Sequence, residues 1–214
     1  MKNKADMRSM FKDAMVLFVI TLFAGLALGF VYELTKDPIR IQQEFAIKKA
    51  CKEVFAQADS FEALHYTPSE QLALQLKEEG ITVDVAYGAY DEAGNALGYV
   101  VQTTTSEGYG GKMTLYIGVT NTGVVNGVSI LEIAETPGLG MQAEEVLTPQ
   151  FAHKAVELFT YTKTGSTLDS EIDAISGATV TTKAFINAVN GGLRAIHEEL
   201  MVEDWVREGG MENE

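Results

Sequence analysis

The chain has few of the residues from which catalytic and metal sites are usually built. Its 214 residues include one cysteine, Cys51, which excludes an intrachain disulfide and a cysteine-cluster metal or iron–sulfur site. The three histidines, His65, His153 and His197, lie far apart without a partner at ligand spacing, so we expect surface or capping roles for them and no metal site. The sequence shows no Ser-His-Asp set, carboxylate pair or P-loop, so redox chemistry would have to come from a cofactor.

Basic residues are also scarce. The sequence has 30 acidic and 16 basic residues, which gives a formal net charge of -14. Proteins that bind nucleic acid present a basic surface to the phosphates, so we expect no nucleic-acid partner. We interpret the acidity as a source of solubility. The length is enough for one domain of ordinary size with appendages.

Charged residues are missing altogether from residues 14–32, an apolar run close to the ~20 residues that cross a bilayer as a helix. A cleavable signal peptide is the alternative, but the apolar run is too long and no small-x-small cleavage site follows it. We predict a basic N-terminus over residues 1–13 and an uncleaved transmembrane anchor over residues 14–34. The positive-inside rule places the N-terminus in the cytoplasm and the rest of the chain on the outer side.

Residues 35–80 carry two helical patterns, which we interpret as a stalk helix and a packing helix. Pro38 occupies a first-turn position, and apolar residues then gather on one side of the helix as far as Phe55. Cys51 lies on that apolar side, which favours a small buried hydrophobe over a reactive thiol. The segment from Thr67 to Glu70 resembles a capping box at the start of the second helix.

Beyond residue 80 the hydrophobic period changes to that of β-strands. Alternation between turn signals predicts four strands, over residues 81–87, 96–105, 113–120 and 124–133. The short connections favour a largely antiparallel meander. We therefore predict an α+β fold, in which a single N-terminal transmembrane helix precedes a sheet flanked by helices over residues 81–200. An acidic tail follows over residues 201–214.

Two glycine-containing loops adjoin the predicted strands. The first is Gly108-Tyr109-Gly110-Gly111-Lys112, which either permits close backbone approach to something flat or is a flexible hairpin loop. The second is Glu135-Thr136-Pro137-Gly138-Leu139-Gly140, in which Pro-Gly alone predicts a turn.

A third segment joins a small-residue loop to a helical pattern that extends to Leu200. It begins at Asp173 and includes Ser176-Gly177-Ala178-Thr179. The free N–H groups at the start of the helix are suited to hold a phosphate. Ser176 or Thr179 could instead simply cap the helix. Gly191-Gly192 within the helical pattern indicates either a kink or close packing.

Together the three segments resemble, in the same order, the motifs of the FMN-binding domain family. These are a Gly-Tyr-x-Gly loop, a Glu-Thr-Pro-Gly-Leu-Gly loop and the flavinylation motif Asp-x-x-Ser/Thr-Gly-Ala-Thr, which residues 173–179 match without a gap. The resemblance implies that Thr179 carries FMN through a phosphoester bond installed by a flavin transferase. It implies for Asp173 a part in recognition or activation during the transfer, where the residue alone would indicate a turn or cap.

The resemblance also implies roles for the neighbouring residues. Ser176 and Gly177 would shape the loop, Ala178 would belong to the same cofactor site, and N–H groups near Thr181 and Thr182 would face the phosphate. These two threonines would lie in the first helical turn, where hydroxyls tend to bond local carbonyls. Four residues of the glycine loops would line the isoalloxazine ring, Tyr109, Thr136, Gly138 and Leu139, and Glu135 would belong to the same cofactor site.

An anchor followed by an FMN-binding domain resembles, over nearly the whole chain, the family of G subunits of Rnf electron transport complexes. That resemblance implies electron transfer between ferredoxin and NAD, coupled to Na⁺ or H⁺ translocation in a bacterial or archaeal cytoplasmic membrane. It also implies membrane and iron–sulfur subunits as partners, and an isolated chain without complete catalytic activity. The related C subunits of the Na⁺-translocating NADH:quinone reductases are one alternative. A membrane-tethered structural or sensory module is another.

Overall fold

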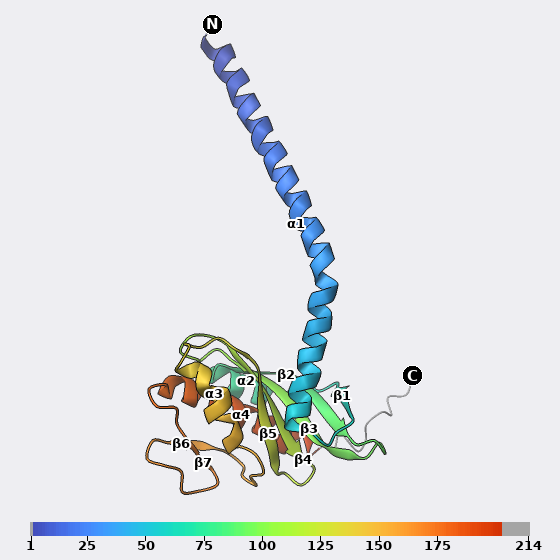
Figure 1. Cartoon of the computed structure of the whole chain (residues 1–214), viewed down its shortest axis with the longest axis vertical. Helices are drawn as coiled ribbons and strands as arrows, with labels where there is room; N and C mark the ends of the chain where they lie inside the picture. The colour runs from blue at the N-terminus through green and yellow to red at the C-terminus, as the bar shows by residue number, and fades with distance from the viewer. Residues whose placement is uncertain (1, 203–214) are drawn as a thin grey trace. The chain divides into compact units, whose positions relative to one another are not determined.

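The structure, a computed structural model, describes residues 2–202 and divides into two units, residues 1–45 and 46–214. Helix α1, Lys2–Val54, contains Pro38 without a break in the helix (Figure 1). The expectation of a separate helix beginning near Pro38 is therefore wrong. A proline removes one intrahelical hydrogen bond but need not end a helix whose two flanks are themselves helical.

Two ion pairs support the helix near Pro38, one before the proline and one that spans it. Lys36 pairs with Glu33, and Arg40 pairs with Asp37, both at a spacing of three residues. Such pairs join neighbouring turns of a helix and each stabilise it by a few tenths of a kcal/mol. The sequence on both sides of the proline therefore continues the helix.

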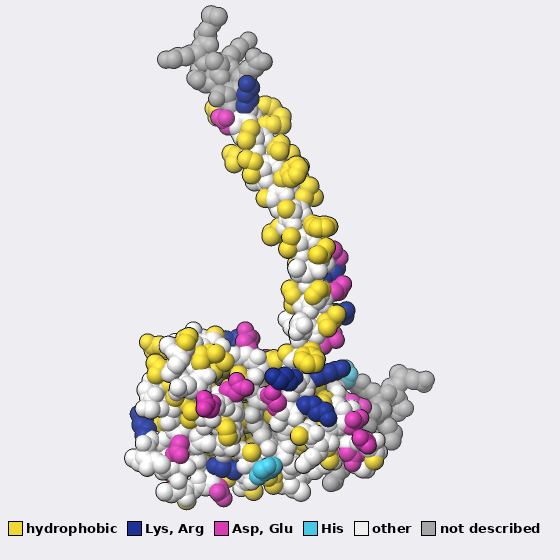
Figure 2. All heavy atoms as spheres, in the orientation of Figure 1, with side chains coloured by type: hydrophobic (Ala, Val, Ile, Leu, Met, Phe, Trp, Pro, Cys, Tyr) yellow, Lys and Arg dark blue, Asp and Glu magenta, His cyan; other side chains and the backbone are white. Residues whose placement is uncertain are grey.

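The segment of α1 before these ion pairs is apolar and exposed. From Met10 to Tyr32 its large apolar side chains are solvent-accessible, as the yellow side chains along it in Figure 2 show. Among residues 2–202 this is the one helix long and apolar enough to cross a membrane. Its length and composition fit a transmembrane span.

Five strands form one sheet in the order β1-β2-β3-β4-β5, with every neighbouring pair antiparallel. The strands are β1 Ser60–Leu64, β2 Ile81–Tyr90, β3 Ala96–Thr105, β4 Met113–Thr120 and β5 Val125–Ile133. The four strands expected from the sequence are present, and the predicted α+β class is confirmed. The edge strand β1 was not predicted. It belongs to the unit of residues 46–214 together with the rest of the sheet.

Helices cover the two faces of the sheet. Helix α4, Thr179–Arg194, packs on one face and continues as a π-helical segment, Ala195–Leu200. The end of α1 packs on the other face, where Cys51 and Val54 contact a cluster that includes Tyr116.

A short helix, α2 Glu70–Glu78, is capped by Ser69, whose Oγ accepts from the Leu72 N–H at 3.3 Å.

Gly191 and Gly192 allow α4 to approach the sheet closely, which decides between the two expectations for them. A Cβ at Gly192 would lie 2.9 Å from Ile117 Cδ1 and 3.1 Å from Thr103 Cγ2. A Cβ at Gly191 would lie 3.0 Å from Ile81 Cγ2. The helix continues through both glycines to Arg194. Close packing is therefore the role of the pair.

Short elements connect β5 to α4. They are the 3-10 helix η1 Gly140–Gln142, helix α3 Ala143–Val146, the 3-10 helix η2 Thr148–Gln150, and strands β6 Thr160–Thr162 and β7 Glu171–Asp173. Strands β6 and β7 pair in parallel as a separate small sheet. The predicted acidic tail lies outside the described residues from 203 onward.

Candidate functional site

The three segments singled out in the sequence line a single cavity of about 460 Å³. The antiparallel pairing of β4 with β5 explains how two of them meet, because Met113 pairs with Ile133 at one end of the hairpin. The loop before Met113 and the loop after Ile133 therefore leave the sheet side by side. The start of α4 completes the wall. The lining residues are Tyr109, Glu135, Thr136, Leu139, Gly140, Gly177, Ala178, Thr179, Val180 and Thr181.

The N-terminus of α4 faces this cavity with free hydrogen-bond donors. The helix begins at Thr179, and its N-cap residue, Ala178, makes no side-chain cap bond. The N–H groups of Thr179, Val180 and Thr181 have no acceptor among the described residues. The helix dipole adds partial positive charge at this end. The cavity wall can therefore hold an anion, and neither Ser176 nor Thr179 acts as the capping side chain.

The N–H of Thr182 is not one of these free donors, which corrects the expectation that it would face a phosphate. It donates to the Ala178 carbonyl at 3.0 Å. The Thr182 hydroxyl is buried, donates to the same carbonyl at 2.9 Å and accepts from the Ile175 N–H at 3.1 Å. Thr182 therefore fixes the loop from inside and does not enter the cavity.

The three threonines of this segment differ in access. Thr179 and Thr181 both line the cavity, but Thr179 is half-buried whereas Thr181 is 1% exposed, and Thr182 is fully buried. Gly177 has φ +78°, a left-handed conformation that favours glycine, and lies next to Leu139. Thr179 is thus the most exposed of the three threonines.

The glycine loops contribute both polar and apolar groups to the cavity. Glu135 is buried, and its carboxylate accepts the N–H groups of Tyr109 and Gly110. The side chains of Tyr109 and Leu139 are exposed at 75% and 42%. Thr136 holds its own loop, since its carbonyl accepts from the Leu139 N–H at 3.2 Å.

Gly138, Ser176 and Asp173 are not among the residues that line the cavity. Gly138 has φ +75° and forms the turn of its loop. Ser176 is exposed on the loop before α4. Gly140 and Val180 also line the cavity and were not expected as site residues, although Gly140 ends the second glycine loop and Val180 follows Thr179.

Asp173 lies at the end of β7 and organises the segment that leads to α4. Its carboxylate accepts from the Ser166 N–H at 2.6 Å. Its backbone N–H donates to Gln150 Oε1 at 2.7 Å, and its carbonyl accepts from Gln150 Nε2 at 3.2 Å. In the folded chain these contacts give Asp173 the structural role of a turn residue.

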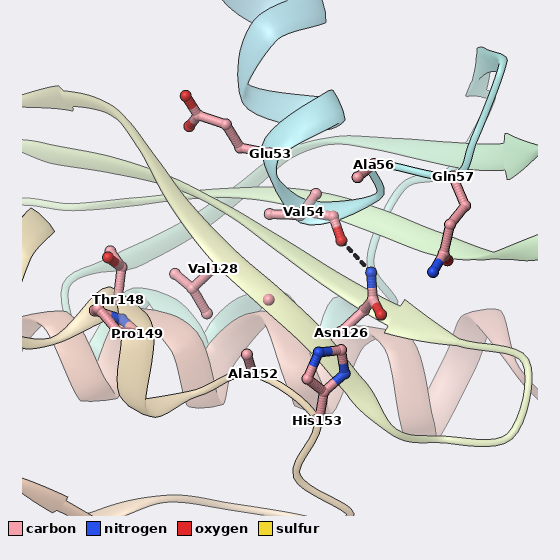
Figure 3. A pocket seen from close by; sticks show the side chains of 11 residues that line it. Glu53, Val54, Ala56, Gln57, Asn126, Val128, Thr148, Pro149, Ala152 and His153 are labelled. Atoms are coloured by element: carbon pink, nitrogen blue, oxygen red, sulfur yellow. Dashed lines mark hydrogen bonds between the residues drawn. The ribbon is translucent and has the colours of Figure 1, made fainter.

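A second cavity, of about 400 Å³, lies beside the end of α1 and strand β5 and contains none of the three segments (Figure 3). Polar groups around it bond within the chain, as the Asn126 side-chain amide does to the Val54 carbonyl. Ser129 likewise donates to Glu53. The cavity formed by the three segments is therefore the better candidate for a ligand site.

The residues of that cavity fit an FMN group. A volume of about 460 Å³ lies within the range of ordinary cofactor pockets. Free N–H groups at a helix start suit a phosphate, and the side chains of Tyr109, Leu139 and Val180 offer apolar surface to a flat ring. The half-buried Thr179 lines the same cavity.

Comparisons with known families agree with this site. Residues 108–194 match the FMN-binding domain, and residues 1–54 match the RnfG N-terminal region. The first match spans the cavity-lining residues, and the second spans α1.

Two named relatives extend the similarity over most of the chain. The G subunit of the Na⁺-translocating ferredoxin:NAD⁺ oxidoreductase complex of Acetobacterium woodii is 32% identical over 88% of this chain and 92% of its own length. The G subunit of the ion-translocating oxidoreductase complex of Methanosarcina acetivorans is 30% identical over 88% of this chain and 95% of its own.

A solved structure supports the fold. The crystal structure of Shewanella oneidensis NqrC matches with a TM-score of 0.51 at 15% identity, over 74% of this chain and 88% of that one. At this level of identity the likeness concerns the fold alone.

Proposed function

Because the chain belongs to the family of G subunits of ion-translocating oxidoreductase complexes, we propose that it is an electron-carrying subunit of an Rnf-type ferredoxin:NAD⁺ oxidoreductase, with FMN joined covalently to Thr179. The observation that carries the proposal is the cavity in which the half-buried Thr179 lies at the uncapped start of α4. The relatives' names support the reaction class, and the cavity supports Thr179 as the attachment residue.

Each part of the cavity has a task in this proposal. The N–H groups of Thr179 to Thr181 bind the phosphate oxygens, and the helix dipole favours their negative charge. Tyr109 and Leu139 border the ring, while Thr182 holds the loop through its bonds to Ala178 and Ile175. Bound FMN supplies the electron-accepting and electron-donating chemistry that the side chains lack.

The proposed linkage is formed during maturation by a flavin transferase that uses an activated flavin nucleotide. The new bond would join Thr179 Oγ1 to the flavin phosphorus, the phosphoanhydride bond of the donor nucleotide would break, and the hydroxyl proton and the nucleoside monophosphate of the donor would depart. A covalent bond would keep the cofactor in a compartment that does not resupply flavin. The Asp173 carboxylate, held by Ser166 near the start of the motif, is a recognition element for this enzyme in the proposal.

Helix α1 is the membrane anchor in this proposal. Its apolar segment is flanked on the N-terminal side by Lys2, Lys4, Arg8 and Lys12, which favours a cytoplasmic N-terminus. The FMN-binding domain then lies on the outer side of the cytoplasmic membrane. The other membrane and iron–sulfur subunits of the complex are its electron-transfer partners, so the chain alone is not a complete enzyme.

The test is to produce full-length variants together with a flavin transferase and to observe flavin fluorescence after denaturing electrophoresis. Thr179→Ala is expected to lose the fluorescent band, and Thr179→Ser, which keeps a hydroxyl, is expected to retain it. Thr181→Ala is the matched control and is expected to keep its flavin, because its side chain is buried. A band that persists in Thr179→Ala would contradict the proposed attachment.

A further inference from the structure

We propose that Glu135 is a positioning residue that joins the two glycine loops and sets Tyr109 at the mouth of the cavity. Glu135 also lines the cavity, so its negative charge lies at the cavity wall. The proposal rests on the proposed function for the meaning of the cavity. Its geometry involves only the residues of this chain.

The Glu135 carboxylate accepts one backbone N–H at each oxygen. The Tyr109 N–H donates to Oε1 at 2.8 Å, and the Gly110 N–H donates to Oε2 at 3.1 Å. The glutamate is 8% exposed, so water competes little for these bonds. Hydrogen bonds to an ionised acceptor are stronger than neutral ones. The two donors lie 26 and 25 residues from Glu135 in the sequence, so these bonds hold the two glycine loops together.

Glycines on both sides make room for this carboxylate. A Cβ at Gly140 would lie 2.7 Å from Glu135 Oε2, and a Cβ at Gly108 would lie 2.7 Å from Oε1. The Cβ at Gly140 would also lie 2.9 Å from the Thr181 hydroxyl. The carboxylate therefore sits in a space that side chains would fill, next to the first turn of α4.

The position of Tyr109 depends on these bonds. Its side chain is 75% exposed, so packing does little to hold it. The bonds at Tyr109 and Gly110 fix the backbone on both sides of the Tyr109 carbonyl. Glu135 thus determines where the aromatic ring borders the cavity. It acts through the backbone of the loop, because both of its carboxylate oxygens accept N–H groups of that loop.

The charge of Glu135 has a second consequence. A negative charge at the wall opposes the addition of an electron to a group held in the cavity, because the two charges repel in a partly buried site. Neutralising Glu135 should therefore shift the midpoint potential of that group to a more positive value.

Glu135→Gln tests the role of the carboxylate while leaving the size of the side chain nearly unchanged. Glutamine has nearly the same shape but one acceptor oxygen and an NH₂ group that only donates. One of the two loop N–H groups would then face another donor. Glu132→Gln is the matched control, because it removes the same charge three residues earlier from a side chain that is 66% exposed and pairs with Lys112 at 4.0 Å.

The first measurement is amide hydrogen exchange at Tyr109 and Gly110 in full-length protein produced without a flavin transferase. Glu135→Gln is expected to speed this exchange by on the order of tenfold, since a bond to a charged acceptor is lost. Glu132→Gln is expected to leave it unchanged. Equal exchange in Glu135→Gln and the parent would overturn the positioning role. This readout involves no flavin, so its outcome is independent of the proposed function.

The second measurement is the midpoint potential of the flavin-loaded full chain. Glu135→Gln is expected to keep its covalent flavin and to show a more positive potential and a lower flavin fluorescence anisotropy than Glu132→Gln. An unchanged potential and anisotropy would overturn the proposed effect of the carboxylate on the cavity. Loss of flavin in the parent chain would contradict the proposed function instead.

If Glu135→Gln fails to fold, Gly140→Ala tests the same contact without changing the charge. Its Cβ would meet Oε2 at 2.7 Å and displace the carboxylate. Faster exchange at Tyr109 and Gly110 is the expected result. Unchanged exchange would overturn the role of this carboxylate.

Discussion

Cys51 is a residue whose surroundings determine its chemistry. It is 1% exposed at the end of α1, and burial raises the pKa of its thiol to about 12 from the usual 9.0. A raised pKa means that the folded chain keeps this proton more firmly than the unfolded chain. The resulting stabilisation is complete below pH 9 and is lost as the pH rises toward 12.

We therefore expect iodoacetamide at pH 9 to modify Cys51 slowly in the folded protein and rapidly in urea. At this pH only about a thousandth of the folded thiol would be ionised, compared with about half in the unfolded chain. Mass spectrometry reads the result directly, because the chain has one cysteine. Similar rates in the folded and unfolded protein would show that the thiol is accessible.

Some residues of the site could be predicted from the sequence, whereas their side-chain partners could not. The motifs pointed to Thr179, Tyr109 and Leu139, which the structure brings to one cavity. They did not indicate that Glu135 is engaged by the N–H groups of a loop 25 residues away, because side-chain partners of that kind depend on tertiary contacts. The contact of Asp173 with Ser166 was missed for the same reason.

At the scale of elements, the packing of α4 on the sheet depends on Gly192. An added methyl would lie 2.9 Å from Ile117 Cδ1, so the helix or the strand would have to shift. Gly192→Ala is expected to lower the free energy of unfolding by about 1–3 kcal/mol, as overpacking usually does. Gly127→Ala in β5 is the control, since its Cβ would have an ordinary contact of 3.6 Å with Val54. Urea unfolding of both variants measures the difference, and equal stabilities would contradict the packing account.

The elements themselves were predictable where the hydrophobic period was regular. Strands β2 to β5 follow from alternation between turn signals, and their boundaries agree closely with the structure. Strand β1, Ser60–Leu64, is five residues long and is an edge strand that forms only against β2, so its own sequence carries little signal. Pro38 was interpreted as a helix start because proline is common in the first turn of a helix. The helical segments on both sides of Pro38 outweigh that local preference.

At the scale of the whole molecule, the proposed orientation predicts that the FMN-binding domain lies on the outer side of the membrane. A Thr122→Cys variant places an exposed thiol in the turn between β4 and β5, whereas Cys51 is buried. In intact cells a membrane-impermeant maleimide is expected to label Thr122→Cys, because the proposed orientation puts the domain outside, and to leave the parent chain unlabelled. Labelling only after the cells are opened would place the domain in the cytoplasm and contradict the proposed orientation.

The central claim is that a phosphoester at Thr179 holds FMN. Trypsin is expected to release residues 164–183 as one peptide, which contains Thr179, Thr181 and Thr182. In protein produced with a flavin transferase, fragmentation of this peptide by tandem mass spectrometry locates the added mass of FMN. We expect the adduct on Thr179 alone. An adduct on Thr181 or Thr182, or an unmodified peptide from a yellow protein, would contradict it.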